Sequence, residues 1–474
     1  MESGGHLFSD KKLFMLIWPL MIEQTLAITL GMADIIMVSS LGEAAVSGVS
    51  LVDTVFILIN GLFAALSTGG AVVCAQFIGK KRNDMASKAA IQLLYTVLAG
   101  AMLMVIAGFF WGRGLLSLLF GKINSDVMAN SQIYFKFMLA SLPSVALYNG
   151  CAALFRAQGN SKVSMSTALL INIIHIGSNA FLLFGLHWGV YGVAVSTLVS
   201  RTIAALVLLS LLRGKRRAGR NANVPSFGGG IMNAESANAE TSRFAISIRG
   251  IRKVSFDLSL VKKILGIGIP NGLENSMFQL GKIVLLSLVS VFGTGAIAAN
   301  AAANTISSFE VLPASSISLA LLTVVGQCMG AGRNDEAVYY TKKLLLIAYV
   351  GMAVLNVPLL LSSKWIIGIY HMSPETSKLG WQMLMIHGVC GMVFWPASFT
   401  LPNALRAAGE AKYTMMVSLL SVWIVRIGMS YVFGVGLGFG ALGVWMAMIC
   451  DWVVRVLFFT GRFARGKWKM LKLV

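Results

Sequence analysis

The chain has 474 residues, of which 57% are hydrophobic and only 12% are charged, and its formal net charge is +20. A soluble chain of this length would hold about a quarter charged residues, so the composition excludes a water-soluble protein and indicates one that crosses the bilayer many times. The positive charge does not indicate nucleic-acid binding, because Lys and Arg occur in short clusters between apolar segments, as in cytoplasmic loops beside anionic headgroups.

Twelve apolar windows follow along the chain, each of about 20 residues, which suffices to cross the hydrocarbon core. They are centred near residues 26, 60, 100, 142, 174 and 201, then near 276, 311, 352, 391, 424 and 452. Each is predicted to be helical, because backbone polar groups in lipid need partners within their own segment.

The connectors between these windows alternate in charge. Basic connectors occur at 79–88, 155–162, 213–220, 330–336, 406–412 and 462–472, and the others are poor in Lys and Arg. The positive-inside rule places the basic set and both termini in the cytoplasm, so we expect a multi-pass protein of the inner (cytoplasmic) membrane.

The connector at 213–255 is much longer than the others. It is basic at its start, then rich in Gly, Asn and Ala, and it contains no apolar segment long enough to span a membrane. This pattern predicts an N-terminal six-helix lobe at 1–212, a basic cytoplasmic linker at 213–255 and a C-terminal six-helix lobe at 256–474.

The two halves repeat each other at an offset of 251 residues without a gap over about 75 positions. Pro19 aligns with Pro270, Glu23 with Glu274, and GKKRNDMA at 79–86 with GAGRNDEA at 330–337. The repeat predicts an all-α membrane protein whose two six-helix bundles are related by a pseudo-two-fold axis along the membrane normal. Transporters of this kind bind substrate between halves that rock about it. A duplicated passive scaffold is the alternative, which intramembrane acids disfavour because they are costly to keep.

The first helix contains a proline followed fifteen residues later by Asp34, and three further motifs occur in order in both halves: the Gly42 loop, Q-x-x-G at Gln76, and R-x-x-G at Arg156. With twelve spans, these motifs resemble the bacterial members of the multidrug and toxic compound extrusion (MATE) family. The resemblance implies a V-shaped pair of bundles that exports amphipathic, often cationic compounds in exchange for H⁺ or Na⁺. It implies no cofactor apart from the coupling ion.

Asp34 and Asp53 are the candidate coupling acids of the first half, since helix counting places both in the outer half of the membrane. The resemblance adds polar groups on the fifth and sixth helices, which here are Asn172, His175, Asn179 and Thr197. Many relatives have Asn and an acid where this chain has His175 and Asn179. That difference weakens the case for a Na⁺ site and supplies a group that titrates near neutral pH. Asp34 as an interfacial acid and His175 as a packing residue are the alternatives.

Glu274 and Glu310 are the candidates in the second half, where they could form a cation or proton site or meet a cationic drug. Pro19, Glu23 and Pro270 are predicted to be structural or gating residues, because they belong to the repeat. Asp451 and Arg455 are four residues apart and are predicted to form a salt bridge within one helix.

The prediction is a secondary antiporter that acts as a monomer on small organic, often cationic compounds, with no nucleic-acid partner and no metal beyond a possible Na⁺ at the coupling site. A flippase for lipid-linked precursors of the same superfamily is one alternative, although it would need a large basic cavity. A membrane-embedded transferase is the alternative from another class. We expect no enzyme, because the sequence contains no metal cluster, phosphate loop or soluble catalytic domain.

Overall fold

The computed structural model describes residues 6–121, 124–213, 245–248, 254–471 and 473–474, and within these residues the chain forms helices and no strands. Most of the predicted linker at 213–255 lies outside the described residues, so its boundaries remain predictions.

The first half consists of six long helices, the fifth of which ends in a π-helical turn. The helices are α1 (Asp10–Ser39), α2 (Glu43–Gly79), α3 (Asn83–Phe120), α4 (Ser125–Ala157), α5 (Ser161–Ala180) with the π-turn η1 (Phe181–Gly185), and α6 (Gly189–Arg213). Pro19 lies inside α1, ten residues into the helix, so it does not begin that helix.

The second half has the same order of spans with more interruptions. It comprises α8 (Leu258–Ser290), α9 (Thr294–Glu310), α10 (Leu312–Gly330), α11 (Asn334–Leu361), α12 (Ser363–Gly368), α13 (Pro374–Trp395), η3 (Pro396–Thr400), α14 (Leu401–Ala407), α15 (Ala411–Leu420), η4 (Ser421–Arg426), α16 (Ile427–Tyr431), η5 (Val432–Gly436), α17 (Gly440–Ala464) and η6 (Lys467–Met470). Only Val311 separates α9 from α10, and together they form the counterpart of α2.

Eleven helices of the described residues are long and apolar enough to cross a membrane by length and composition. The twelfth span is α8, which has 33 residues but is more polar because it contains Asn271, Glu274 and Asn275. Much of α8 packs on α2 and α15 and so faces protein, where polar side chains cost less than in lipid. The all-α class and the twelve spans predicted from the sequence are confirmed.

The repeat extends to individual backbone conformations. Gly42 and Gly293 both adopt positive φ, +92° and +97°, between the first two helices of their halves, a region that favours glycine. The π-turns η1 and η5 also lie 251 residues apart, and in each the N–H five residues after the first donates to its carbonyl: Leu186 to Phe181 and Leu437 to Val432. The two halves therefore share local geometry as well as helix order.

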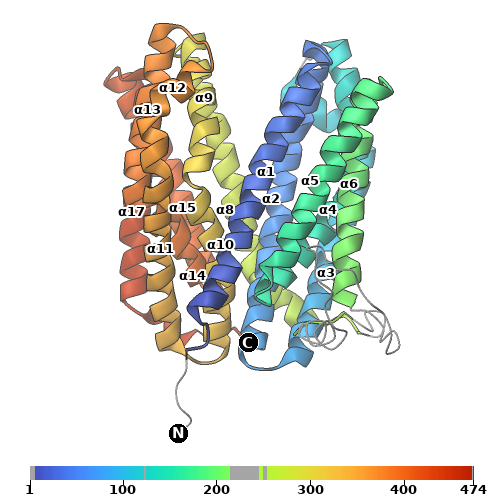
Figure 1. Cartoon of the computed structure of the whole chain (residues 1–474), viewed down its shortest axis with the longest axis vertical. Coiled ribbons are helices and arrows are strands. Elements are labelled where there is room, and N and C mark those ends of the chain that lie inside the picture. The colour runs from blue at the N-terminus through green and yellow to red at the C-terminus, as the bar shows by residue number, and fades with distance from the viewer. Residues whose placement is uncertain (1–5, 122–123, 214–244, 249–253, 472) are drawn as a thin grey trace, which may run out of the picture.

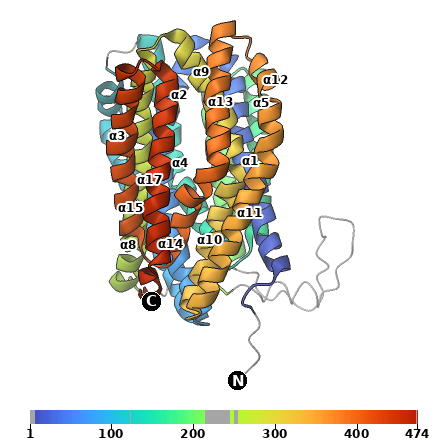
Figure 2. The same cartoon turned by 90° about the vertical axis from the view of Figure 1, so that its left-hand side faces the viewer.

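The blue-to-green helices of the first half and the yellow-to-red helices of the second lie on opposite sides of the molecule and diverge toward one end, which we call the open end (Figure 1). Both termini lie at the other end in both views (Figure 2). At this closed end α2 crosses α10. A Cβ on Gly79 would overlap the carbonyl oxygen of Gln327, and a Cβ on Gly330 would overlap that of Gln76. The two glycines permit the close crossing.

The closed end is also held by side chains that reach across the repeat axis. Gln76 Nε2 donates to the carbonyl of Ala407 at 2.7 Å, and Gln327 Nε2 donates to that of Ala157 at 2.8 Å. The Q-x-x-G motif thus supplies both the glycine of the crossing and the amide that ties each half to the other.

Two chain segments cross between the halves at the closed end. Residues 6–10, the N-terminal strap, lie on α11: the Tyr340 hydroxyl accepts from the N–H of Phe8 at 2.9 Å and donates to its carbonyl at 2.7 Å. Residues 245–248, which precede the second half, lie on the first, where Gln158 Oε1 accepts from the N–H of Ile246 at 3.0 Å. Each half therefore holds the segment that leads into the other.

Candidate functional site

The first candidate centre joins α1 to α5 through Asp34 and His175. His175 Nε2 lies 2.7 Å from Asp34 Oδ1, and the imidazole is buried while the Asp34 side chain is 34% exposed. Asp34 lies five residues before the end of α1 at the open end. The pair thus consists of a buried imidazole and a carboxylate that is accessible near the open end.

The other ring nitrogen of His175 fixes its orientation, because Nδ1 lies 3.1 Å from the hydroxyl of Ser200 on α6. The hydroxyl of Ser196, one turn earlier on α6, donates to the backbone carbonyl of His175 at 2.9 Å. The imidazole is thus held between a carboxylate on α1 and the Ser200 hydroxyl on α6, while Ser196 holds the His175 backbone, and neither serine was predicted from the sequence.

The remaining predicted residues on α5 and α6 have three different environments. Asn172 Nδ2 donates to the carbonyl of Leu26 at 2.8 Å and so ties α5 to α1. Asn179 is fully buried, and its amide has no partner among the described residues, so it is available to an ion or a polar ligand. Thr197 donates to the carbonyl of Val193 on its own helix. The structure therefore brings His175 to Asp34 and does not bring Thr197 to it.

Asp53 lies on α2 with a partner of its own. Its Oδ1 accepts from the hydroxyl of Tyr134 on α4 at 3.1 Å. Asp34, His175 and Arg201 are close enough to act on Asp53 electrostatically, although no hydrogen bond joins the two carboxylates. Asp53 and Asp34 thus belong to one polar region but are held by separate groups.

Glu23 and Glu274, which the repeat aligns, form equivalent ion pairs with the arginines of the two R-x-x-G motifs. Arg156 Nη1 lies 2.8 Å from Glu23 Oε1, and Arg406 Nη2 lies 2.6 Å from Glu274 Oε1. Each carboxylate also accepts from a serine hydroxyl, that of Ser164 or Ser418. Because the pair is repeated, it is part of the shared architecture, and Glu274 is not free in this conformation.

Glu310 is fully buried and makes an ion pair with His387 on α13. The imidazole packs edge-on against Trp445 and Trp452 of α17. Glu274 and Glu310, which were predicted to act together, are therefore engaged by different bases on different helices.

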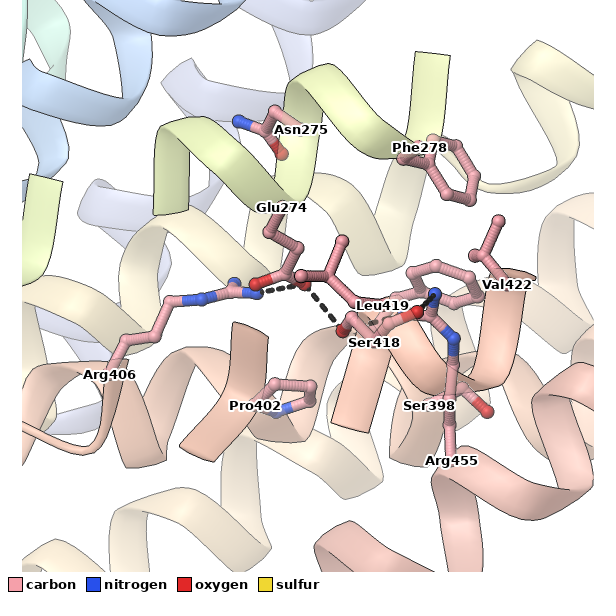
Figure 3. A pocket seen from close by; sticks show the side chains of 11 residues that line it. Glu274, Asn275, Phe278, Ser398, Pro402, Arg406, Ser418, Leu419, Val422 and Arg455 are labelled. Carbon is pink, nitrogen blue, oxygen red and sulfur yellow. Dashed lines mark hydrogen bonds and ion pairs between the residues drawn. The ribbon is translucent and has the colours of Figure 1, made fainter. Parts of the chain in front are cut away.

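A cavity of about 170 Å³ opens beside Glu274 in the second half (Figure 3). Its walls are formed by Glu274, Asn275, Phe278, Ser398, Phe399, Pro402, Arg406, Ser418, Leu419, Val422 and Arg455. Arg455, in the wall of the cavity, makes the salt bridge within α17 that the sequence predicted, since its Nε lies 2.9 Å from Asp451 Oδ1. The cavity combines an apolar wall with two guanidinium groups.

No group of three or more His, Cys, Asp or Glu side chains suited to a metal ion occurs in the part of the chain that the structure describes.

Comparison with known proteins identifies the family to which the chain belongs. The MatE family model matches the chain twice, at residues 19–181 and 270–432, once in each half. The chain belongs to the MatE family. It is 26% identical to the "Uncharacterized transporter YisQ" of Bacillus subtilis, over 94% of this chain and 92% of that protein. It is 24% identical to the "Probable multidrug resistance protein NorM" of Thermotoga maritima, over 97% and 93%.

The fold of the MatE chain agrees with solved structures. An "outward-facing conformation of a multidrug resistance MATE family transporter of the MOP superfamily" matches with a TM-score of 0.84 at 20% identity, over 97% of this chain and 96% of that one. The family assignment from sequence motifs is therefore confirmed, and the chain is a multi-pass membrane transporter of the twelve-helix MatE fold.

Sequence reasoning on this MatE transporter missed three bases that hold the candidate acids. Arg156 and Arg406 were recognised only as motif residues, although their equivalence in the repeat paralleled that of Glu23 and Glu274. His387 was missed because the tenth span was searched for acids. A lone histidine in an apolar span is a signal that could have found it.

Proposed function

We propose that the protein is a secondary active antiporter of the inner (cytoplasmic) membrane that exports amphipathic organic compounds, often cationic ones, in exchange for protons. The pairing of Asp34 with His175 carries this proposal. Histidine is the side chain most suited to proton exchange near neutral pH, and here it is hydrogen-bonded to a carboxylate that is accessible from one end of the molecule.

Accessibility supports Asp34 as the group that exchanges a proton for a cation. The Asp34 side chain is 34% exposed, whereas those of Glu274 and Glu310 are 10% and 0% exposed. A proton arriving from the open end neutralises Asp34 and weakens its hold on a cationic group. Glu274 and Glu310 hold or release substrate only if their ion pairs open, and Asp53 acts electrostatically within the same polar region as Asp34.

The placement of the basic connectors supports the orientation of the proposed transporter. Both termini lie at the closed end, and the positive-inside rule favours the cytoplasm for the basic connectors and the termini, so we assign the closed end to the cytoplasmic side. The open end then faces outward, where protons enter. Rocking of the halves about the closed end exchanges access, and a monomer suffices for this motion.

The flippase alternative is supported less well. It requires a large basic cavity, and the basic cavity beside Arg406 and Arg455 holds about 170 Å³, which is smaller than a sugar linked to pyrophosphate.

The test is transport in proteoliposomes with pH and sodium gradients imposed separately. In Asp34→Asn, we expect ethidium efflux driven by a pH gradient to fall by about ten-fold or more. In His175→Gln, which keeps a hydrogen-bonding group but cannot titrate, efflux should lose its dependence on pH between about pH 5 and 8. Glu43→Gln, at an exposed acid at the start of α2, is the matched control and should transport normally. Coupled transport at the wild-type rate in Asp34→Asn would contradict the proposal.

A further inference from the structure

The cavity in the second half is bordered by more positive than negative charge. Four cationic side chains lie in or beside it, Lys282, Arg406, Arg426 and Arg455, against two carboxylates, Glu274 and Asp451. At neutral pH this leaves an excess of two positive charges within the membrane-spanning region. Lys282 is exposed, whereas the Arg426 side chain is only 11% exposed, so the excess is costly chiefly at Arg426 unless an anion compensates it.

Both carboxylates are used by the two arginines that line the cavity. Glu274 accepts from Arg406, and Asp451 accepts from Arg455. Figure 3 shows the Arg406 and Arg455 guanidinium groups on either side of Glu274 and Ser418, with Phe278 at the upper right, on the same helix as Glu274. The excess charge therefore belongs to the other two cations, Lys282 and Arg426.

Arg426 and Lys282 have no hydrogen-bonded acid among the residues that the structure describes. Arg426 Nη1 is 3.9 Å from Asp451 Oδ2, which is beyond hydrogen-bonding distance, and its buried Nε has no partner. Lys282 Nζ lies 5.1 Å from the centroid of the Phe278 ring, and the Arg426 guanidinium carbon lies 5.7 Å from the same centroid. The Arg455 guanidinium carbon lies 6.0 Å from that centroid, so three cations share one aromatic ring at the wall of the cavity, and Arg455 alone of them has a hydrogen-bonded acid.

Like charges gathered at one ring repel each other, and their cation–π contacts are individually weak. An anionic group within reach of both Lys282 and Arg426 would remove the repulsion and satisfy the free donors. Guanidinium and ammonium groups together are suited to carboxylate and phosphate oxygens. The neighbouring wall is apolar, with Phe278, Phe399 and Val422, and an apolar cavity of about 150 Å³ admits benzene.

We propose that Lys282 and Arg426 bind the anionic group of an amphipathic ligand whose apolar ring occupies the cavity between Phe278 and Phe399. The binding site itself does not depend on the proposed transport function; only the statement that the bound ligand is transported rests on it. If the ligand is transported, the compounds exported include amphiphiles that bear a carboxylate, zwitterions among them. A carboxylate of a transported compound and a phosphate of a membrane lipid share the required chemistry.

The test is equilibrium binding to the purified full chain in neutral detergent, which requires no coupled transport. The probes are 2-naphthoate and its uncharged analogue 2-naphthamide, with affinity measured by calorimetry. We expect naphthoate to bind about ten-fold more tightly than naphthamide. Lys282→Gln and Arg426→Gln should each remove most of that preference while leaving the affinity for naphthamide within about two-fold. Retained naphthamide binding shows that a variant is folded.

Lys364 offers a matched control, because its Nζ lies 5.0 Å from the Trp381 ring, outside the cavity. Lys364→Gln should keep the preference for naphthoate, and Lys282→Arg, which keeps the charge, should retain most of it. Equal binding of the two probes by the wild-type chain, or an unchanged preference in both Gln variants, would overturn the proposal.

Two further experiments identify the source of the anion and distinguish failure of this proposal from failure of the antiport proposal. Competition by phosphatidylglycerol but not by phosphatidylcholine assigns the site to an anionic lipid headgroup, and absence of competition assigns it to a transported compound. Asp34→Asn should bind naphthoate like the wild type, so loss of proton-coupled efflux and loss of anion binding are distinguishable outcomes.

Discussion

At the scale of single residues, the acids named as candidates within the spans are paired, and most of their partners come from other helices. Glu23 meets Arg156, Glu274 meets Arg406, Asp34 meets His175 and Glu310 meets His387. An unpaired carboxylate in the membrane costs several kcal/mol, and an ion pair with supporting hydrogen bonds offsets much of that cost. The pairs explain how a chain with so few charges keeps acids inside its bundles.

The repeated pair Glu23–Arg156 provides a prediction about stability. Arg156→Met leaves Glu23 buried without a base, so the free energy of unfolding should fall by about 3 kcal/mol. The double variant Glu23→Gln with Arg156→Met should recover most of the loss, because no unpaired charge remains. Thermal unfolding in detergent measures both.

The control for this prediction is Lys343→Met, which breaks a pair with Asp10, whose side chain is 81% exposed. This change should cost much less than Arg156→Met, because solvent screens an exposed ion pair. Equal losses of unfolding free energy for Arg156→Met and Lys343→Met would show that the buried Glu23–Arg156 pair stabilises the protein no more than an exposed pair does.

The repeat in the sequence predicted which acids belong to the architecture, but it could not pair them. Glu310 and His387 are 77 residues apart, and only packing brings α9 against α13. Hydropathy cannot identify the inward face of a span, because lipid and protein interior are both apolar. For this reason the serines that hold His175 were missed, while Thr197 was selected although it bonds to its own helix.

At the scale of elements, the positions of the spans followed from hydropathy, whereas their internal breaks did not. The counterpart of α2 is divided at Val311, two residues before Pro313, and proline cannot donate the helical hydrogen bond of its position. The first half has Leu62 at the position equivalent to Pro313, and α2 is continuous there. The repeat therefore preserves helix order while single substitutions change local shape.

The N-terminal strap gives a prediction at this scale. Tyr340 is fully buried and bonds both backbone groups of Phe8, so Tyr340→Phe leaves an N–H and a carbonyl without their partner. The free energy of unfolding should fall by about 2 kcal/mol, and residues 6–10 should become more accessible to protease. Thermal unfolding and limited proteolysis measure the two effects.

Tyr339→Phe is the matched control, because Tyr339 is 42% exposed and its ring stacks on His6 without bonding the strap backbone. It should change the free energy of unfolding by less than about 0.5 kcal/mol. If the two variants behave alike, the strap is held by its aromatic contacts and not by the Tyr340 hydroxyl.

At the scale of the whole molecule, glycines permit the closest backbone contacts described between the two halves. Gly69 lies against the backbone of Ile264 on α8, and Gly79 and Gly330 lie at the crossing of α2 and α10. The crossing glycines and the glutamines at Gln76 and Gln327 occupy equivalent positions in the repeat, so the closed end is itself built around the pseudo-two-fold axis. A methyl group added at Gly79 or Gly330 would therefore overlap the other half at the crossing.

Gly330→Ala should therefore separate the halves at the closed end, because its Cβ would overlap the carbonyl oxygen of Gln76 and α10 must move away from α2. Spin labels at the exposed positions Arg82 and Asp335, in a variant without the native cysteines, report the distance between the halves. We expect the distance distribution to shift to longer values. Gly61→Ala, also on α2 but with nothing within 4 Å of its Cβ, should leave the distribution unchanged and be neutral or stabilising, since Ala favours helix. An unchanged distribution in Gly330→Ala would mean that the crossing does not hold this conformation.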